Sequence, residues 1–132
     1  MDTKRTHRRL GNTDQVNFIV GLGGITLAPL GYPQAVRLAH DAIDAGVTHF
    51  DTAPSYGDAE AKMGQVLADR RDEVFLSCKT QCRDAEGATR ELHESLRRLQ
   101  TDHIDLYQFH ALDTDEDLEQ VAGEGGAYQA FL

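Results

Sequence analysis

Apolar and polar residues follow two different periods along the chain, and the alternation of these periods predicts strands separated by helices. Short apolar or alternating runs, typical of buried strands, cover residues 19–23, 47–51, 74–79 and 104–110. Between them the apolar residues recur every three or four positions, which predicts helices over 33–45, from Asp58 to about residue 67, and over 88–99. In the first helix, one apolar face is predicted to carry Ala35, Leu38, Ala42 and Ala45.

Two further extended segments, 7–10 and 15–20, lie near the N-terminus. They flank Gly11-Asn12-Thr13-Asp14, whose residues tolerate the backbone angles of a tight turn, so we predict a β-hairpin.

The alternation of strands and helices with short loops predicts right-handed βαβ units and a parallel sheet. A doubly wound nucleotide-binding sheet would carry G-x-G-x-x-G running directly into a helix. Here Thr26 stands at the last glycine position of Gly21–Thr26, and the helix begins only near Pro33. The alternative, a (β/α)8 barrel, places its chemistry at the C-terminal ends of the strands.

Four residues at or near the strand ends form the candidate catalytic site. Asp51, Lys79 and His110 end three of the runs, and Tyr56 lies in the loop after Asp51. Counting by twos along each strand places the three strand-end side chains on inward faces, together with His49, Ser77 and Gln108. A phenol is a weak acid, with a reference pKa of about 10, and an ammonium group beside it favours the phenolate. We therefore predict a proton-donating site in which Asp51 holds Lys79.

Composition narrows the class of protein. The chain has 132 residues, 40% of them apolar and 27% charged, which predicts one globular domain over 1–132. Its 22 acidic and 13 basic residues give a net charge of −9, which disfavours a nucleic-acid partner. Without an apolar run of about 20 residues or a signal-peptide pattern, we expect a cytoplasmic protein with no membrane contact. Cys78 and Cys82 lack the second pair of a zinc site, so we expect reduced thiols and no metal.

At these residues the chain resembles the aldo-keto reductase family, and its bacterial monomeric-type members most. FDTAxxYG together with the strand-end Lys and His is the specific signature, and the likeness runs from about residue 7 to 121. The matching segments are RRLGNT, GLGG, AIDAGVTHFDTAPSYGDAEAKMGQVL, DEVFLSCKT and ESLRRLQTDHIDLYQFHA. The resemblance implies the N-terminal half of a (β/α)8 TIM barrel, with strands 1–4, helices 1–3 and a β-hairpin closing the bottom. It also implies NAD(P)H-dependent reduction of aldehydes or ketones, with a small carbonyl compound as substrate.

The resemblance also implies roles for the four residues. Tyr56 would be the general acid, Lys79 its cationic neighbour, Asp51 the partner of Lys79, and His110 the group that orients the carbonyl. The cofactor, NADPH or NADH, would be contacted by the loop after the first strand and, at its ribose, by Asp51. The loop residues are Gly23, Gly24 and Ile25.

A complete barrel of this type needs roughly 250 residues. We therefore expect a hairpin and the start of strand 1 over 7–20, and βα units 1–4 over 20–132, with a fourth helix that opens near Gly125 and is cut by the chain end. In the family the remaining strands supply most contacts to the pyrophosphate and adenosine phosphate. We favour a partial record of a longer reductase, although the open sheet edges could also drive self-association.

Other functions stay open at this point. One is a catalytically inactive fragment, or a nucleotide-binding or partner-binding module of the same fold. A further alternative is a Schiff-base aldolase, in which Lys79 would be the nucleophile.

Overall fold

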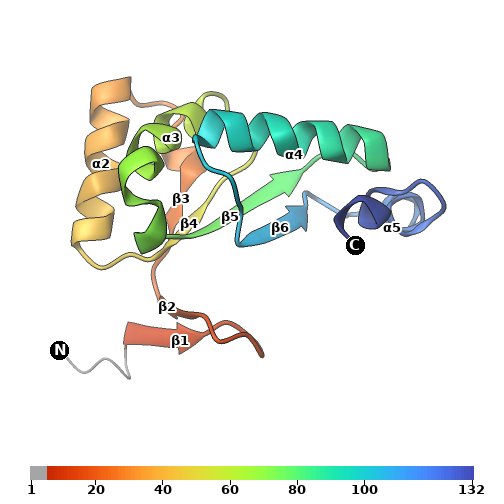
Figure 1. The fold of residues 1–132 in the computed structure, drawn as a ribbon, viewed down its shortest axis with the longest axis horizontal. Helices are drawn as coiled ribbons and strands as arrows, with labels where there is room; N and C mark the ends of the chain where they lie inside the picture. The colour runs from red at the N-terminus through yellow and green to blue at the C-terminus, as the bar shows by residue number, and fades with distance from the viewer. Residues whose placement is uncertain (1–5) are drawn as a thin grey trace.

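A four-stranded parallel sheet lies at the centre of the fold (Figure 1). The computed structural model describes residues 6–132. The strands are hydrogen-bonded in chain order, and each run predicted from the sequence overlaps one, although β5 extends one residue beyond its predicted run. They are β3 (Leu22–Gly23), β4 (His49–Asp51), β5 (Phe75–Thr80) and β6 (Leu106–Phe109).

Three helices connect these strands and lie along one face of the sheet, as Figure 1 shows. They are α2 (Tyr32–Asp44), α3 (Ala59–Arg70) and α4 (Ala85–Leu99), with short 3₁₀ turns η1 (Gly24–Thr26) and η2 (Arg71–Glu73). Because a helix follows each of the first three strands and every pairing is parallel, the predicted βαβ succession is confirmed.

The main core lies between the sheet and these helices. Phe50 and Leu76 are fully buried on the helix side, against apolar residues of α2 and α3. The prediction of which residues form the inner face of α2 is partly wrong, because Leu38 is 39% exposed and Ala45 is exposed as well. The buried positions are Ala35, Ala39 and Ile43, at a strict spacing of four. Two of the three are alanines, whose small side chains allow close packing, and the element that α2 contacts most is α3.

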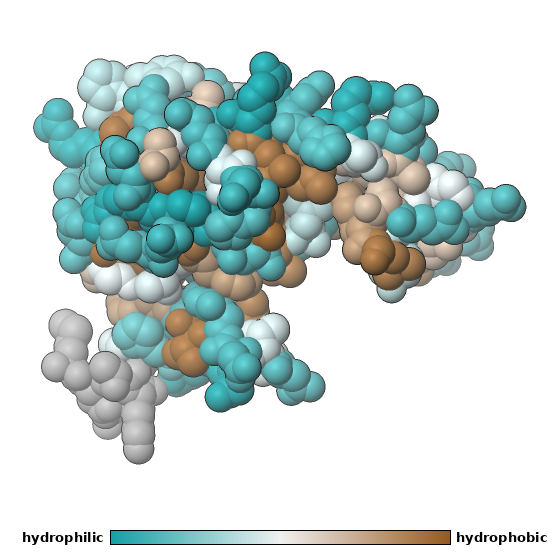
Figure 2. Space-filling model, in the orientation of Figure 1, coloured by the Kyte–Doolittle hydropathy of each residue, from teal (hydrophilic) through white to brown (hydrophobic). Residues whose placement is uncertain are grey.

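The hairpin β1 (His7–Arg9) and β2 (Val16–Phe18) is antiparallel, as predicted. Its Phe18 N–H donates to Thr48 Oγ1 at 3.1 Å, just before β4, so the hairpin lies at the N-terminal ends of the strands. Residues 19 and 20, predicted to start the first core strand, are more than half exposed and connect hairpin to sheet. Figure 2 shows apolar atoms at the surface of this region.

The segment after β6 differs from the prediction. A helix, α5 (Asp115–Ala122), begins ten residues earlier than expected, and the stretch near the C-terminus forms only the 3₁₀ turn η3 (Ala127–Phe131). Thr114 caps α5 by accepting a hydrogen bond from the N–H of Asp117 at 3.1 Å. The acidic first turn stabilises this helix through its dipole, which explains why so polar a segment is helical. The fourth helix expected near Gly125 is therefore replaced by α5, which lies directly after β6.

None of the helices within 6–132 is long and apolar enough to cross a membrane. Over the same residues, no group of three or more His, Cys, Asp or Glu side chains is arranged to hold a metal ion.

Candidate active site

An ion pair joins the C-terminal ends of β4 and β5. Asp51 is the last residue of β4 and pairs in register with Ser77, so Lys79 reaches one step further along the same face. Lys79 Nζ lies 2.8 Å from Asp51 Oδ1 and 2.6 Å from Oδ2, and it donates to the carbonyl oxygen of Thr52 at 2.9 Å. The three N–H bonds of the ammonium therefore all have partners, and the predicted Asp51–Lys79 pair is present.

Tyr56 and His110 complete the cluster. Lys79 Nζ lies 5.2 Å from the centroid of the Tyr56 ring, so the cation contacts the ring itself. The His110 ring meets the same phenol edge to face, with centroids 5.7 Å apart and planes at 88°. All four residues singled out in the sequence are thus gathered at one end of the sheet, although they come from three strand ends and a loop.

A second polar pair lies deeper in the same face. His49 Nε2 and Ser77 Oγ are 2.6 Å apart, and Ser77 is only 1% exposed. The His49 ring also meets Phe75 edge to face, at 5.3 Å. The polar side chains that the period of two placed on the inner face satisfy each other there, as a buried polar group requires. Gln108, the third polar residue predicted to lie on this face, is exposed.

The predicted cofactor loop borders this site. Gly23 pairs with Asp51 in the sheet, and a Cβ built there would meet only Ile25, at 3.9 Å. Gly24 has a different reason to be glycine, since a Cβ would lie 2.8 Å from Thr52 Oγ1 and 3.0 Å from the carbonyl oxygen of Asp51. Ile25 is 54% exposed. The loop therefore offers free space and an apolar side chain beside Asp51, which fits a flat, partly apolar group such as a nicotinamide.

Three polar residues near the site were not found from the sequence. Ser55 Oγ lies 3.4 Å from His110 Nδ1, and Arg83 Nη2 donates to the carbonyl oxygen of His110 at 2.8 Å. Lys62, only 2% exposed, donates to the carbonyl oxygens of Leu27 and Ala28 at 3.1 and 2.8 Å. Both cations bind backbone carbonyls far away in sequence, and no local pattern could have shown this.

The buried thiol Cys78 belongs to the opposite face of the sheet. Burial, and then the nearby Glu60 carboxylate, raise the pKa of the Cys78 thiol to about 12. Cys78 is fully buried among the core residues that pack against the helices. A thiol held neutral in the core does not act as a nucleophile at the site.

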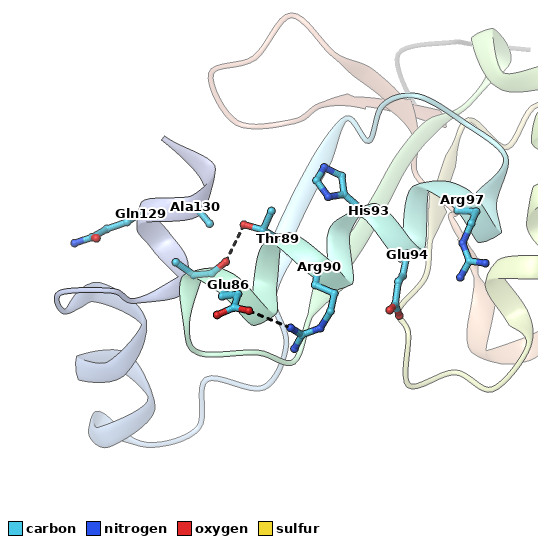
Figure 3. A pocket seen from close by; sticks show the side chains of 9 residues that line it. Glu86, Thr89, Arg90, His93, Glu94, Arg97, Gln129 and Ala130 are labelled. Atoms are coloured by element: carbon cyan, nitrogen blue, oxygen red, sulfur yellow. Dashed lines mark hydrogen bonds and ion pairs between the residues drawn. The ribbon is translucent and has the colours of Figure 1, made fainter.

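A groove of about 930 Å³ lies elsewhere, on the outer side of α4 (Figure 3). It runs between α4 and η3, where Ala130 lies on the side of Thr89 and the Gln129 side chain points away from α4. None of its lining residues belongs to the four-residue cluster, so the groove and the candidate site are separate features.

Comparison with known proteins places this geometry in a family. The model of the Aldo/keto reductase family matches residues 19–125. The Bacillus subtilis aldo-keto reductase YhdN is 35% identical over 115 residues, which is 76% of this chain and 35% of that protein. The chain thus spans about a third of the length of the curated relatives it matches.

Solved structures of aldo-keto reductases are also similar to this chain. The holo form of aldo-keto reductase AKR11C1 from Bacillus halodurans superposes with a TM-score of 0.75 at 29% identity, covering 88% of this chain and 45% of that one. A Klebsiella pneumoniae aldo/keto reductase, in complex with NADP and acetate, gives a TM-score of 0.71 at 31% identity, covering 88% of this chain and 44% of that one.

These neighbours are (β/α)8 barrels, and the four parallel strands with their helices correspond to part of such a barrel, as predicted. The family match covers all four strands and every residue of the Asp51, Tyr56, Lys79 and His110 cluster. The chain belongs to the aldo/keto reductase family of oxidoreductases.

Proposed function

We propose that this chain carries the proton-donating and carbonyl-orienting part of an NAD(P)H-dependent reductase of aldehydes or ketones. One observation supports this most: Lys79 is bound by both oxygens of Asp51 and lies against the ring of Tyr56, and the His110 ring meets the same tyrosine ring edge to face. A phenol with a fixed cation beside it and an imidazole at its edge is suited to giving a proton to a carbonyl oxygen.

The roles follow from the contacts. The Tyr56 hydroxyl would donate its proton to the substrate oxygen, and the positive charge of Lys79 would stabilise the negative charge left behind. Asp51 holds that cation in place. His110, fixed by Ser55 at Nδ1, would orient the carbonyl with its remaining ring nitrogen.

The space beside Asp51 fits the cofactor. A bound nicotinamide cofactor, NADPH or NADH, would supply the hydride. Gly23, Gly24 and Ile25 would contact its nicotinamide end, and Asp51, whose side chain is 36% exposed, keeps lone pairs for a ribose hydroxyl. The Klebsiella pneumoniae neighbour is in complex with NADP, which supports this choice of cofactor.

The same contacts disfavour the Schiff-base alternative. A nucleophilic amine needs a free lone pair, whereas Lys79 donates all three N–H bonds to Asp51 and Thr52. Borohydride trapping with a carbonyl substrate is therefore expected to leave Lys79 unmodified.

The test measures binding and turnover separately. NADPH fluorescence in the presence of the purified chain reports binding, and NADPH absorbance with a set of aldehydes and ketones reports reduction. We expect Tyr56→Phe to lower kcat by about 10² to 10⁴-fold with unchanged NADPH affinity. Tyr128→Phe on η3, at a half-exposed tyrosine outside the site, is the matched control and should behave as the parent.

Two results would contradict the proposal. Binding of NADPH without reduction of any carbonyl compound would support a nucleotide-binding module of this fold. Absence of both binding and turnover would leave an inactive fragment.

A further inference from the structure

Ala111, directly after His110, has a backbone conformation that is unusual for alanine. Its φ is +52°, in the left-handed region. A side chain with a Cβ is disfavoured there, and such conformations persist only where surrounding contacts hold them. The peptide after His110 is therefore held by something outside the turn.

Arg83 makes the contacts that hold it. Its Nη2 donates to two successive carbonyl oxygens, those of His110 at 2.8 Å and Ala111 at 2.9 Å. A guanidinium nitrogen that bridges these two carbonyls restrains the φ and ψ angles of Ala111, which lies between them, whereas a single bond would leave those angles freer to change.

The other side of the guanidinium is anchored on α5. Arg83 Nε lies 3.0 Å from Asp117 Oδ1, and the hydrogen bond from Arg83 lowers the pKa of the Asp117 carboxyl below its usual range. Arg83 Nη1 is buried and has no partner among the described residues, so three bonds determine where the guanidinium lies. Two join it to the His110–Ala111 turn and one to the first turn of α5.

We propose that Arg83 is the positioning residue for His110: by holding the left-handed turn at Ala111 against Asp117, it sets the position of the imidazole at the edge of the Tyr56 ring. The inference rests on the proposed function for its catalytic consequence. Its structural part is that Arg83 keeps Ala111 left-handed and keeps the His110 ring in contact with the Tyr56 ring. This part can be tested without measuring turnover. Ser55 orients the ring through Nδ1, and Arg83 places the backbone that carries it.

A spectroscopic experiment tests the structural part. In the isotope-labelled chain, the Cα and Cβ chemical shifts of Ala111 report its left-handed conformation, and a nuclear Overhauser effect between the Tyr56 and His110 rings reports their contact. Arg83→Met keeps the aliphatic stem and removes the guanidinium. We expect it to move the Ala111 shifts toward ordinary values and to abolish the ring contact. Arg90→Met on α4, at an arginine that is mostly exposed, is the matched control and should change neither.

Kinetics test the catalytic consequence. We expect Arg83→Met to lower kcat by about 10 to 100-fold, since a displacement of about 1 Å at a reacting group can reduce the rate that much. The KM for NADPH should stay within about twofold, because Arg83 contacts neither the glycine loop nor Asp51. Arg83→Lys, a point charge that cannot reproduce the fork, should fall between parent and Arg83→Met.

A second substitution separates positioning from general damage. Glycine adopts positive φ without penalty, so the turn should depend less on Arg83 when Ala111→Gly is present. The loss in kcat caused by Arg83→Met should then be at least about threefold smaller than in the parent chain, a non-additivity that loss of stability alone would not produce.

Several outcomes would overturn the inference. Unchanged Ala111 shifts and an intact ring contact in Arg83→Met would show that Arg83 does not hold the turn. A fall in kcat no larger than that of Arg90→Met would show that the hold does not serve His110. If the parent chain reduces no carbonyl compound, the proposed function fails, and the ring contact still decides whether Arg83 positions His110.

Discussion

The two faces of the parallel sheet are built from alternate residues of the same strands, yet they differ in chemistry. On the helix side, Phe50, Leu76 and Cys78 are fully buried in the apolar core. On the other side, His49 pairs with Ser77, and Asp51 pairs with Lys79. Residues one position apart in a strand therefore belong to the apolar core on one face and to the candidate site on the other.

The difference lies in the kind of interaction. Burial of apolar surface is non-directional and tolerates changes of shape, so the helix face needs only volume and hydrophobicity. Polar pairs need particular atoms at particular distances, and an unpaired member is unfavourable when buried. Stability should thus be sensitive to size on the helix face, and activity to chemical identity on the polar face.

The largest loss of stability is expected from Phe50→Ala. Removing a fully buried aromatic side chain deletes its transfer free energy and leaves a cavity, which should lower the free energy of unfolding by about 3–5 kcal/mol. Urea unfolding followed by circular dichroism measures it. Phe75→Ala, at a half-buried position on the polar face, is the matched control, and a loss there as large as at Phe50 would contradict the comparison.

Lys79→Met should lower stability only slightly and activity strongly. The Asp51 carboxylate left behind is 36% exposed and can be hydrated, so we expect the free energy of unfolding to fall by only about 1–2 kcal/mol. The kcat for carbonyl reduction should fall by at least about 100-fold, because the cation beside Tyr56 is lost. Steady-state kinetics and urea unfolding of the same preparation measure both. A loss of stability as large as for Phe50→Ala would make the pair a structural element.

A smaller loss of stability is expected at the hydrogen-bonded pair of His49 and Ser77. Ser77→Ala leaves His49 Nε2 without its partner and should lower the free energy of unfolding by about 1 kcal/mol. His49→Leu and the double variant complete a cycle, and we expect a coupling energy of about 1 kcal/mol from the four urea curves, that of the parent included. Additive losses would show that the 2.6 Å contact contributes nothing specific.

The smallest effect at neutral pH concerns the thiol on the helix face. Burial raises the pKa of Cys78 from 9.0 to about 12, so the folded state binds this proton more tightly than the unfolded state does. The resulting stability is complete below about pH 9 and is lost as the pH rises toward 12. At neutral pH, mass spectrometry after iodoacetamide treatment should show modification of the partly exposed Cys82, and of Cys78 only after unfolding. Equal rates at both thiols would show that this face opens readily.

Local patterns were sufficient for much of the fold and the site. The period of two in β4 and β5 separated the two faces, and the spacing of strands and helices predicted the parallel sheet. The pattern of apolar residues failed in α2, where Ala35, Ala39 and Ile43, at every fourth position, are buried and the large apolar Leu38 is 39% exposed. It also failed at α5, because acidic residues obscured a helix whose capping residue, Thr114, was nevertheless visible in the sequence.

The sequence by itself determined which residues form the candidate site, because a strand period of two and a loop of fixed length bring Asp51, Tyr56, Lys79 and His110 to one end of a parallel sheet. Only the tertiary structure decided how they are held. Arg83 and Lys62 bind backbone carbonyls 27 to 35 positions away in the chain. A carbonyl oxygen belongs to every residue and leaves no mark on the sequence, so such contacts appear only once the chain is folded.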